Sequence, residues 1–138
     1  MKSKHLFPLL ATMAVLAVGM ANAQLGDAHV RADVPFAFMV GTQTFPAGQY
    51  TVRQMNDMGN LAIVGSGSAL TIASSHRVET PNAQKLTKLV FHRYGERYFL
   101  YEIWLQGENA GRQLSRTPLE KELASNQRPS SVAVLAAK

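Results

Sequence analysis

Residues Lys85–Gln106, KLTKLVFHRYGERYFLYEIWLQ, decide the fold. Two runs rich in β-branched and aromatic residues meet there at Gly95-Glu96. Such residues suit a pleated, half-buried surface, and a leading glycine supplies the positive φ that a tight hairpin turn requires. The stretch therefore predicts a β-hairpin in the middle of a sheet.

A two-residue turn also fixes which residues of this hairpin face each other. Apolar residues then fall on both faces of the ribbon, with Trp104 on the face of Leu89 and with Ile103 on the opposite face. We therefore expect the hairpin to be covered on both sides. The predicted cross-strand pairs are Tyr94–Arg97, His92–Phe99, Phe91–Leu100 and Leu89–Glu102.

The stretch from Val30 to Val40 shows the clearest alternation in the chain, because every second residue is apolar. It predicts one strand. Pro35 has no N–H to donate to a neighbouring strand, so we expect this strand to lie at an edge or to bulge there. Further strands are predicted up to about residue 116. In the segment Ala69–Glu79, His76 shares a face with Leu70 and Ile72.

Thr117-Pro118-Leu119-Glu120 breaks the strand pattern. Thr is a good N-cap, Pro fits the first helical position, and Glu three residues after Thr completes a capping box. A short helix is expected over about residues 118–125, followed by a tail over 126–138 in which Val132–Ala137 is either a final strand or loose. The pattern predicts an all-β domain over residues 24–138, an antiparallel β-barrel or β-sandwich of about 6–8 strands.

The first 23 residues have the three parts of a secretory signal peptide. A basic start precedes the apolar stretch Leu6–Met20, and Ala21-Asn22-Ala23 places small residues where a signal peptidase reads. The apolar stretch is 15 residues long, whereas a membrane-spanning helix needs about 20. Export to the periplasm or the extracellular space, with cleavage after Ala23, is favoured over a transmembrane anchor, and no membrane span is expected after cleavage.

Charge and cysteine content narrow the function classes. Without Lys2 and Lys4 the net charge is 12 − 9 = +3, with the basic residues spread singly along the chain. Nucleic-acid binding proteins concentrate such residues in a patch, so no nucleic-acid partner is expected. The chain has no cysteine, which excludes disulfides and thiolate catalysis.

Motifs for catalysis, metals and cofactors are not found. Gly65-Ser66-Gly67 lacks the spacing of a nucleophile elbow, and no histidine pair has metal-ligand spacing. We predict no catalytic residue, no metal site and no cofactor.

Two histidines interrupt apolar faces. His76 lies in phase with Leu70 and Ile72, and His92 lies in phase with Phe99 and Tyr101. An imidazole on an apolar face must find a partner or stay neutral. A hydrogen-bonded core or barrel-end histidine is favoured, and the ligand-site hypothesis places His76, His92 and Tyr101 at an inward-facing site. Glu102 is expected to form an ion pair with an arginine such as Arg93 or Arg97.

Two stretches together, VPFAFMVGTQTFPAGQYTV and KLVFHRYGERYFLYEIW, carry a resemblance to a family. They resemble small exported β-rich proteins of acidobacteria-like soil bacteria, over most of residues 30–125. The resemblance implies export and a β fold. It implies no activity, substrate or active-site residue.

These patterns are compatible with three functions. The first is a non-enzymatic module that binds a small molecule or an extended partner, at the mouth of the barrel or at an exposed strand edge. The second is a structural protein of the cell envelope. The third and least favoured is a small hydrolase or isomerase built around His92, with Glu102 or Asp33 as its partner.

Overall fold

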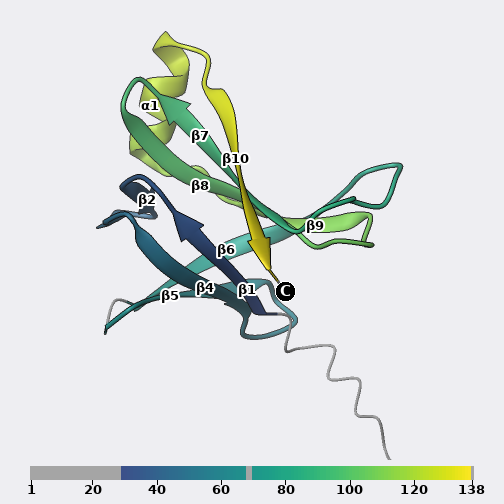
Figure 1. The fold of residues 1–138 in the computed structure, drawn as a ribbon. Helices are drawn as coiled ribbons and strands as arrows, with labels where there is room; N and C mark the ends of the chain where they lie inside the picture. The colour runs from purple at the N-terminus through teal and green to yellow at the C-terminus, as the bar shows by residue number, and fades with distance from the viewer. Residues whose placement is uncertain (1–28, 68–69, 138) are drawn as a thin grey trace, which may run out of the picture.

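A computed structural model describes residues 29–67 and 70–137 (Figure 1), so the predicted signal peptide lies outside the described residues. The described part contains ten strands and one helix. These elements are β1 His29–Val34, β2 Phe38–Val40, β3 Gln43–Phe45, β4 Gly48–Gln54, β5 Asn60–Gly65, β6 Leu70–Glu79, β7 Lys88–Tyr94, β8 Arg97–Trp104, β9 Ala110–Leu114, α1 Pro118–Asn126 and β10 Ser130–Ala137.

Eight of the strands close into an antiparallel barrel. Their order around the ring is β1, β4, β5, β6, β9, β8, β7 and β10, and β10 pairs with β1 to complete it. The all-β prediction is confirmed, and the architecture is the barrel. Within the described residues no helix has the length and apolar character needed to cross a membrane.

The segment whose state the sequence left open is the strand that closes the ring. β10 runs from the end of α1 towards the start of β1 (Figure 1) and pairs with β7 over six residues. Among the described residues it meets β1 at two registered pairs, Arg31↔Ala137 and Ala32↔Ala136. Val132 and Val134 of this strand pack against the core, while Leu135 is 65% exposed. Pairing between β1 and β10 therefore closes the barrel.

The strand predicted from Val30 to Val40 is split in two. β1 ends at Val34, and the chain resumes as β2 at Phe38. Pro35 explains the break, because it cannot donate to a ladder. Phe36, in the break, stacks on Tyr98 at 3.8 Å between ring centroids and meets Phe91 edge-on. The β2–β3 hairpin follows and pairs with β8 at Met39↔Phe99. The aromatic group of Phe36, Phe91 and Tyr98 packs against the core at this end of the barrel.

The central hairpin is formed by β7 and β8, and its register is as predicted for the pairs nearest the turn. Tyr94↔Arg97, His92↔Phe99 and Phe91↔Leu100 are confirmed. A bulge between Val90 and Phe91 then shifts the ladder, so that Leu89 faces Ile103 and not Glu102. An extra residue on one strand moves all later side chains to the opposite face.

The bulge changes the surroundings of Trp104 and Glu102. Ile103 joins the barrel core, and Trp104 lies on the outer wall over Gly111, where a Cβ would come within 2.6 Å of the indole. Glu102 accepts a hydrogen bond from Trp104 Nε1 at 2.8 Å. The predicted ion pair of Glu102 with Arg93 or Arg97 is therefore wrong, and the carboxylate is instead bound by the indole two residues along the same strand face.

The helix starts as predicted, with one difference. Thr117 is the N-cap, and its Oγ1 accepts from the backbone N–H of Glu120 at 3.1 Å. The Glu120 side chain does not return this bond to Thr117, as a capping box requires. It is buried and points to the outer side of β7, where α1 lies against the barrel.

Candidate functional site

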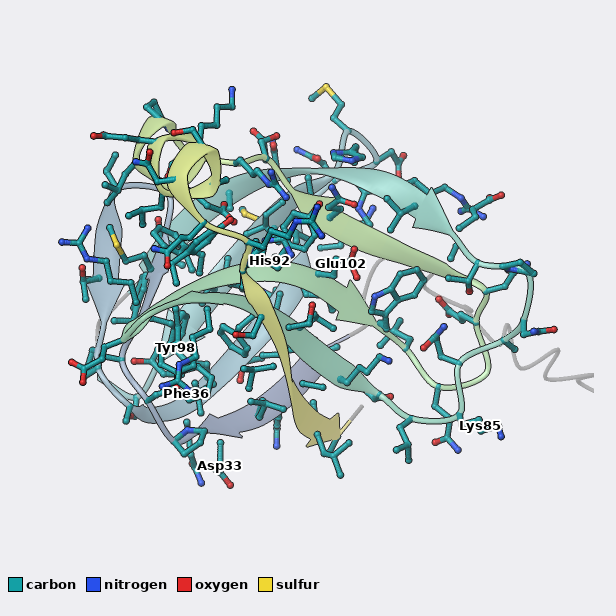
Figure 2. The ribbon with its side chains drawn as sticks, turned by 90° about the horizontal axis from the view of Figure 1, so that it is seen from above. Asp33, Phe36, Lys85, His92, Tyr98 and Glu102 are labelled. Carbon is teal, nitrogen blue, oxygen red and sulfur yellow. The ribbon has the colours of Figure 1, made fainter. Side chains whose placement is uncertain are left out.

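The barrel end opposite the aromatic group is hollowed. Figure 2 shows Phe36 and Tyr98 together at one end of the molecule and Lys85 in a loop at the other. The hollow at this second end has a volume of about 730 Å³. It lies between the loop after β4 and the turn after β8 and is lined from six strands, β1, β4, β5, β6, β8 and β9.

The hollow has an apolar floor and a charged rim. Its floor is the end of the barrel core, where Val30, Val52, Leu61 and Ile103 are almost fully buried. Leu105 extends this apolar surface from the floor towards the rim and is half-buried. Small-molecule sites in proteins combine such apolar walls with a few polar groups, in volumes of about 300–1,000 Å³. The charged residues of the rim are Arg53, Asp57, Arg77, Glu108 and Arg112.

Arg112 is held in a fixed position inside the rim. Its Nε donates to Ser75 Oγ and its Nη2 donates to the Ser75 carbonyl, both at 2.9 Å. Ser75 in turn donates its backbone N–H to the carbonyl of Gly59, which ties the loop after β4 to β6. The arginine can approach because Gly59 has no side chain, and its φ of +90° suits glycine. The guanidinium is therefore pre-positioned by the fold.

Arg77 lies directly opposite Arg112 in the β6–β9 ladder. Arg112 also pairs with Ile103, a core residue, so both arginines lie on the inner side of the barrel wall. Arg77 Nε donates to Glu79 Oε1 at 2.9 Å in an exposed ion pair. The five charged rim residues sum to 3 − 2 = +1.

Sequence reasoning missed this site. It placed the apolar face of β6, with Leu70 and Ile72, inside the barrel, but these two side chains are 53% and 57% exposed. The inner face carries Ala73, Ser75 and Arg77 instead. The sequence does contain one signal for this site, because Arg77 and Arg112 each lie near the end of a strand. Their proximity depends on the non-local pairing of β6 with β9 and could not be predicted locally.

His92, predicted at an inward-facing site, is buried on the outer side of the barrel under α1. Its Nδ1 lies 2.9 Å from Oε1 of Glu120, and its ring stacks on Tyr101 at 3.7 Å. Strand alternation turns Phe91 into the core and His92 outward. The favoured expectation of a hydrogen-bonded histidine is confirmed, while its inward direction is wrong. His92 is not among the residues that line the barrel-end hollow.

Tyr101 and His76 lie on the same outer wall as His92. Tyr101 accepts a hydrogen bond from the side chain of Gln113, and the Arg116 guanidinium lies 5.6 Å from its ring centroid. His76 is opposite Gln113 in the ladder and is exposed, so it too faces outward and not inward. The structure thus brings His92 and Tyr101 into contact, with His76 beyond Gln113. A ligand-binding role for these three residues stays a prediction.

Two tyrosines have altered acidity. Burial raises the pKa of Tyr94 above its ordinary value of 10.0, with the negative charge of Glu120 adding to the shift and Arg116 opposing it. Burial also raises the pKa of Tyr50, whose hydroxyl donates to the Pro46 carbonyl. The folded protein therefore keeps these protons at a pH where unfolded chains lose them.

This difference predicts a loss of stability in alkali. Above about pH 10 the unfolded state binds fewer protons than the folded state, so the free energy of unfolding falls as the pH rises. The urea midpoint should drop between about pH 9 and pH 11, and it should drop less in Tyr94→Phe than in the parent protein. Parallel curves for the two proteins would contradict this role of Tyr94.

The remaining polar chemistry of the described residues is modest. Among them, no group of three or more histidine, aspartate or glutamate side chains is arranged to hold a metal ion. No buried side-chain nitrogen or oxygen within residues 29–67 and 70–137 lacks a hydrogen-bond partner. Comparison with protein-family models, with curated proteins and with solved structures gives no match to the chain.

Proposed function

We propose that this protein is a non-enzymatic binding module that takes a small molecule with an apolar part into the barrel-end hollow. The observation that carries the proposal is the hollow of about 730 Å³ that opens onto the apolar core at one end of the barrel, while aromatic side chains pack against the core at the other end. An apolar group that enters leaves water for the apolar lining of the hollow, in which Leu105 and Ala110 are half-buried above the core.

The surroundings of His92 support this choice over an enzyme. His92 is only 7% exposed, and its imidazole contacts Glu120 and Tyr101, which is the arrangement of a group that holds a helix against the barrel. A general base needs contact with its substrate. The hollow, in contrast, is open to solvent at its rim, where Arg77 is exposed.

The signal-peptide pattern supports placing this binding outside the cytoplasm, in the periplasm or the extracellular space. A cysteine-free barrel suits such a compartment, because its stability does not depend on the redox state. A structural role in the cell envelope is the competing function. It requires no ligand in the hollow, so a binding measurement separates the two.

Filling the hollow should abolish binding of an apolar ligand. Ala110 lies at the rim on the inner face of β9, so Ala110→Trp places an indole in the entrance. We expect at least a tenfold (~1.4 kcal/mol) weaker affinity for the neutral fluorescent ligand N-phenyl-1-naphthylamine than in the parent protein. The measurement is a fluorescence titration of the processed chain, starting at Gln24.

The matched control is Ala133→Trp, which adds the same side chain at an exposed position on the outer side of β10. It should bind the ligand like the parent protein. Circular dichroism of both variants checks that the barrel is intact. Failure of the parent protein to bind this ligand, or equal binding by Ala110→Trp, would overturn the proposal, and the first result would favour the structural role.

A further inference from the structure

We infer that the ligand carries a negatively charged headgroup, a carboxylate in the first instance, and that this headgroup is bound between Arg77 and Arg112. The inference rests on the proposed function and names the chemical class of ligand that the hollow takes. It describes an amphipathic anion, with its charge at the rim and its apolar tail on the floor.

The first observation is the pairing of like charges. Arg77 and Arg112 are directly opposite in an antiparallel ladder, where Cβ atoms lie about 4.5–5.5 Å apart and like charges destabilise the pair. Glu79 offsets this repulsion only weakly at Arg77, because the two side chains of that ion pair are 64% and 63% exposed to solvent. An anion bound between them would remove the repulsion.

The second observation is that Arg112 is held in position and still has N–H donors without an acceptor. Of its five N–H donors, two are directed to Ser75. Among the described residues, the other donors of Arg112 have no hydrogen-bond acceptor, although the side chain is half-buried and lines the hollow. A guanidinium fixed along one edge presents its free edge to a carboxylate with little loss of entropy.

The surroundings of the two arginines favour an amphipathic anion over a free one. Ile103, the partner of Arg112 on β8, belongs to the apolar floor, so a headgroup at Arg112 leaves its tail next to apolar side chains. Asp57 and Glu108 also line the rim, but both are exposed and neither pairs with an arginine within the part of the chain that the structure describes. A small anion alone would gain only the charge contact.

The experiment compares two ligands that differ in the headgroup alone. Decanoate and 1-decanol are titrated against the bound N-phenyl-1-naphthylamine, and acetate serves as a headgroup without a tail. The parent protein should bind decanoate about tenfold more tightly than 1-decanol, because a charge-assisted hydrogen bond to arginine is stronger than a neutral one. Arg77→Gln should reduce this preference severalfold, measured as the ratio of the two affinities within the same variant. Arg112 is left intact so that the Gly59 loop keeps its anchor.

The control is Arg97→Gln, which removes an exposed arginine at the other end of the barrel. It should keep the full preference for decanoate. Equal affinities for decanoate and 1-decanol, or an unchanged preference in Arg77→Gln, would overturn the headgroup inference and leave apolar binding in place. Acetate that competes as well as decanoate would replace the amphipath by a free anion. Absence of binding by every ligand, including the fluorescent one, would overturn the proposed function together with this inference.

Discussion

Replacing Glu120 by alanine is expected to lower the free energy of unfolding by about 2–5 kcal/mol. Glu120 is 3% exposed, and its Oε1 lies 2.9 Å from His92 Nδ1 and accepts from the Tyr94 hydroxyl at 3.4 Å. Truncation leaves both partners buried under α1 without an acceptor, and it opens a cavity between the helix and β7. The isosteric change Glu120→Gln keeps an oxygen in place and should cost less, about 1 kcal/mol.

Urea unfolding measures both effects, followed by circular dichroism and by the fluorescence of Trp104, the single tryptophan of the chain. Glu122→Ala is the control, since Glu122 is exposed on the same helix and its loss should change stability by no more than about 0.5 kcal/mol. The double variant His92→Leu/Glu120→Leu tests the pairing itself. It should be less destabilised than the two single changes added together, because each single change strands the other partner. Strict additivity would mean that the two residues act separately.

The hairpin shows how far local sequence rules reach. Gly95-Glu96 and the flanking β-formers were sufficient to predict the turn and three cross-strand pairs. The bulge at Val90/Phe91 was not predictable, because no residue there is specific for a bulge. Its cause is tertiary, since it allows Leu100 and Ile103 both to face the core.

Neither the closure of the barrel nor the assembly of the hollow could be predicted from the sequence, for a related reason. Val132, Ala133, Val134 and Leu135 suit a strand or a loose tail equally well, and their strand pairing depends on β7, about forty residues earlier in the chain. The alternation of β6 correctly predicts a strand, but the face predicted to point inward points outward. Its larger apolar residues are outside, because the interior at this level accommodates Ser75 and the guanidinium of Arg112. Long-range pairing thus decides which of two alternating faces becomes a site.

Gly59 lies against Arg112, a rim residue of the hollow, and leaves no space for a side chain. Gly59→Ala is expected to destabilise the protein by about 2–5 kcal/mol, as the sum of strain at a φ of +90° (about 1–3 kcal/mol) and steric overlap (about 1–3 kcal/mol). The new Cβ would lie 2.5 Å from the Ser75 carbonyl oxygen and would overlap the Arg112 guanidinium. Urea unfolding at neutral pH measures the loss.

Gly107→Ala separates the two contributions. Gly107 has a similar φ of +82°, but a Cβ there meets nothing within 4 Å, so this variant carries the strain without the overlap. The difference between the two variants, about 1–3 kcal/mol, measures the space that Arg112 needs. If Arg112 must leave Ser75 to make room, Gly59→Ala should also lose preference for decanoate over 1-decanol. Equal stability losses in the two variants would mean that Arg112 and the Ser75 carbonyl move away from the new methyl group without cost, which would contradict a tightly fixed Arg112 at Gly59.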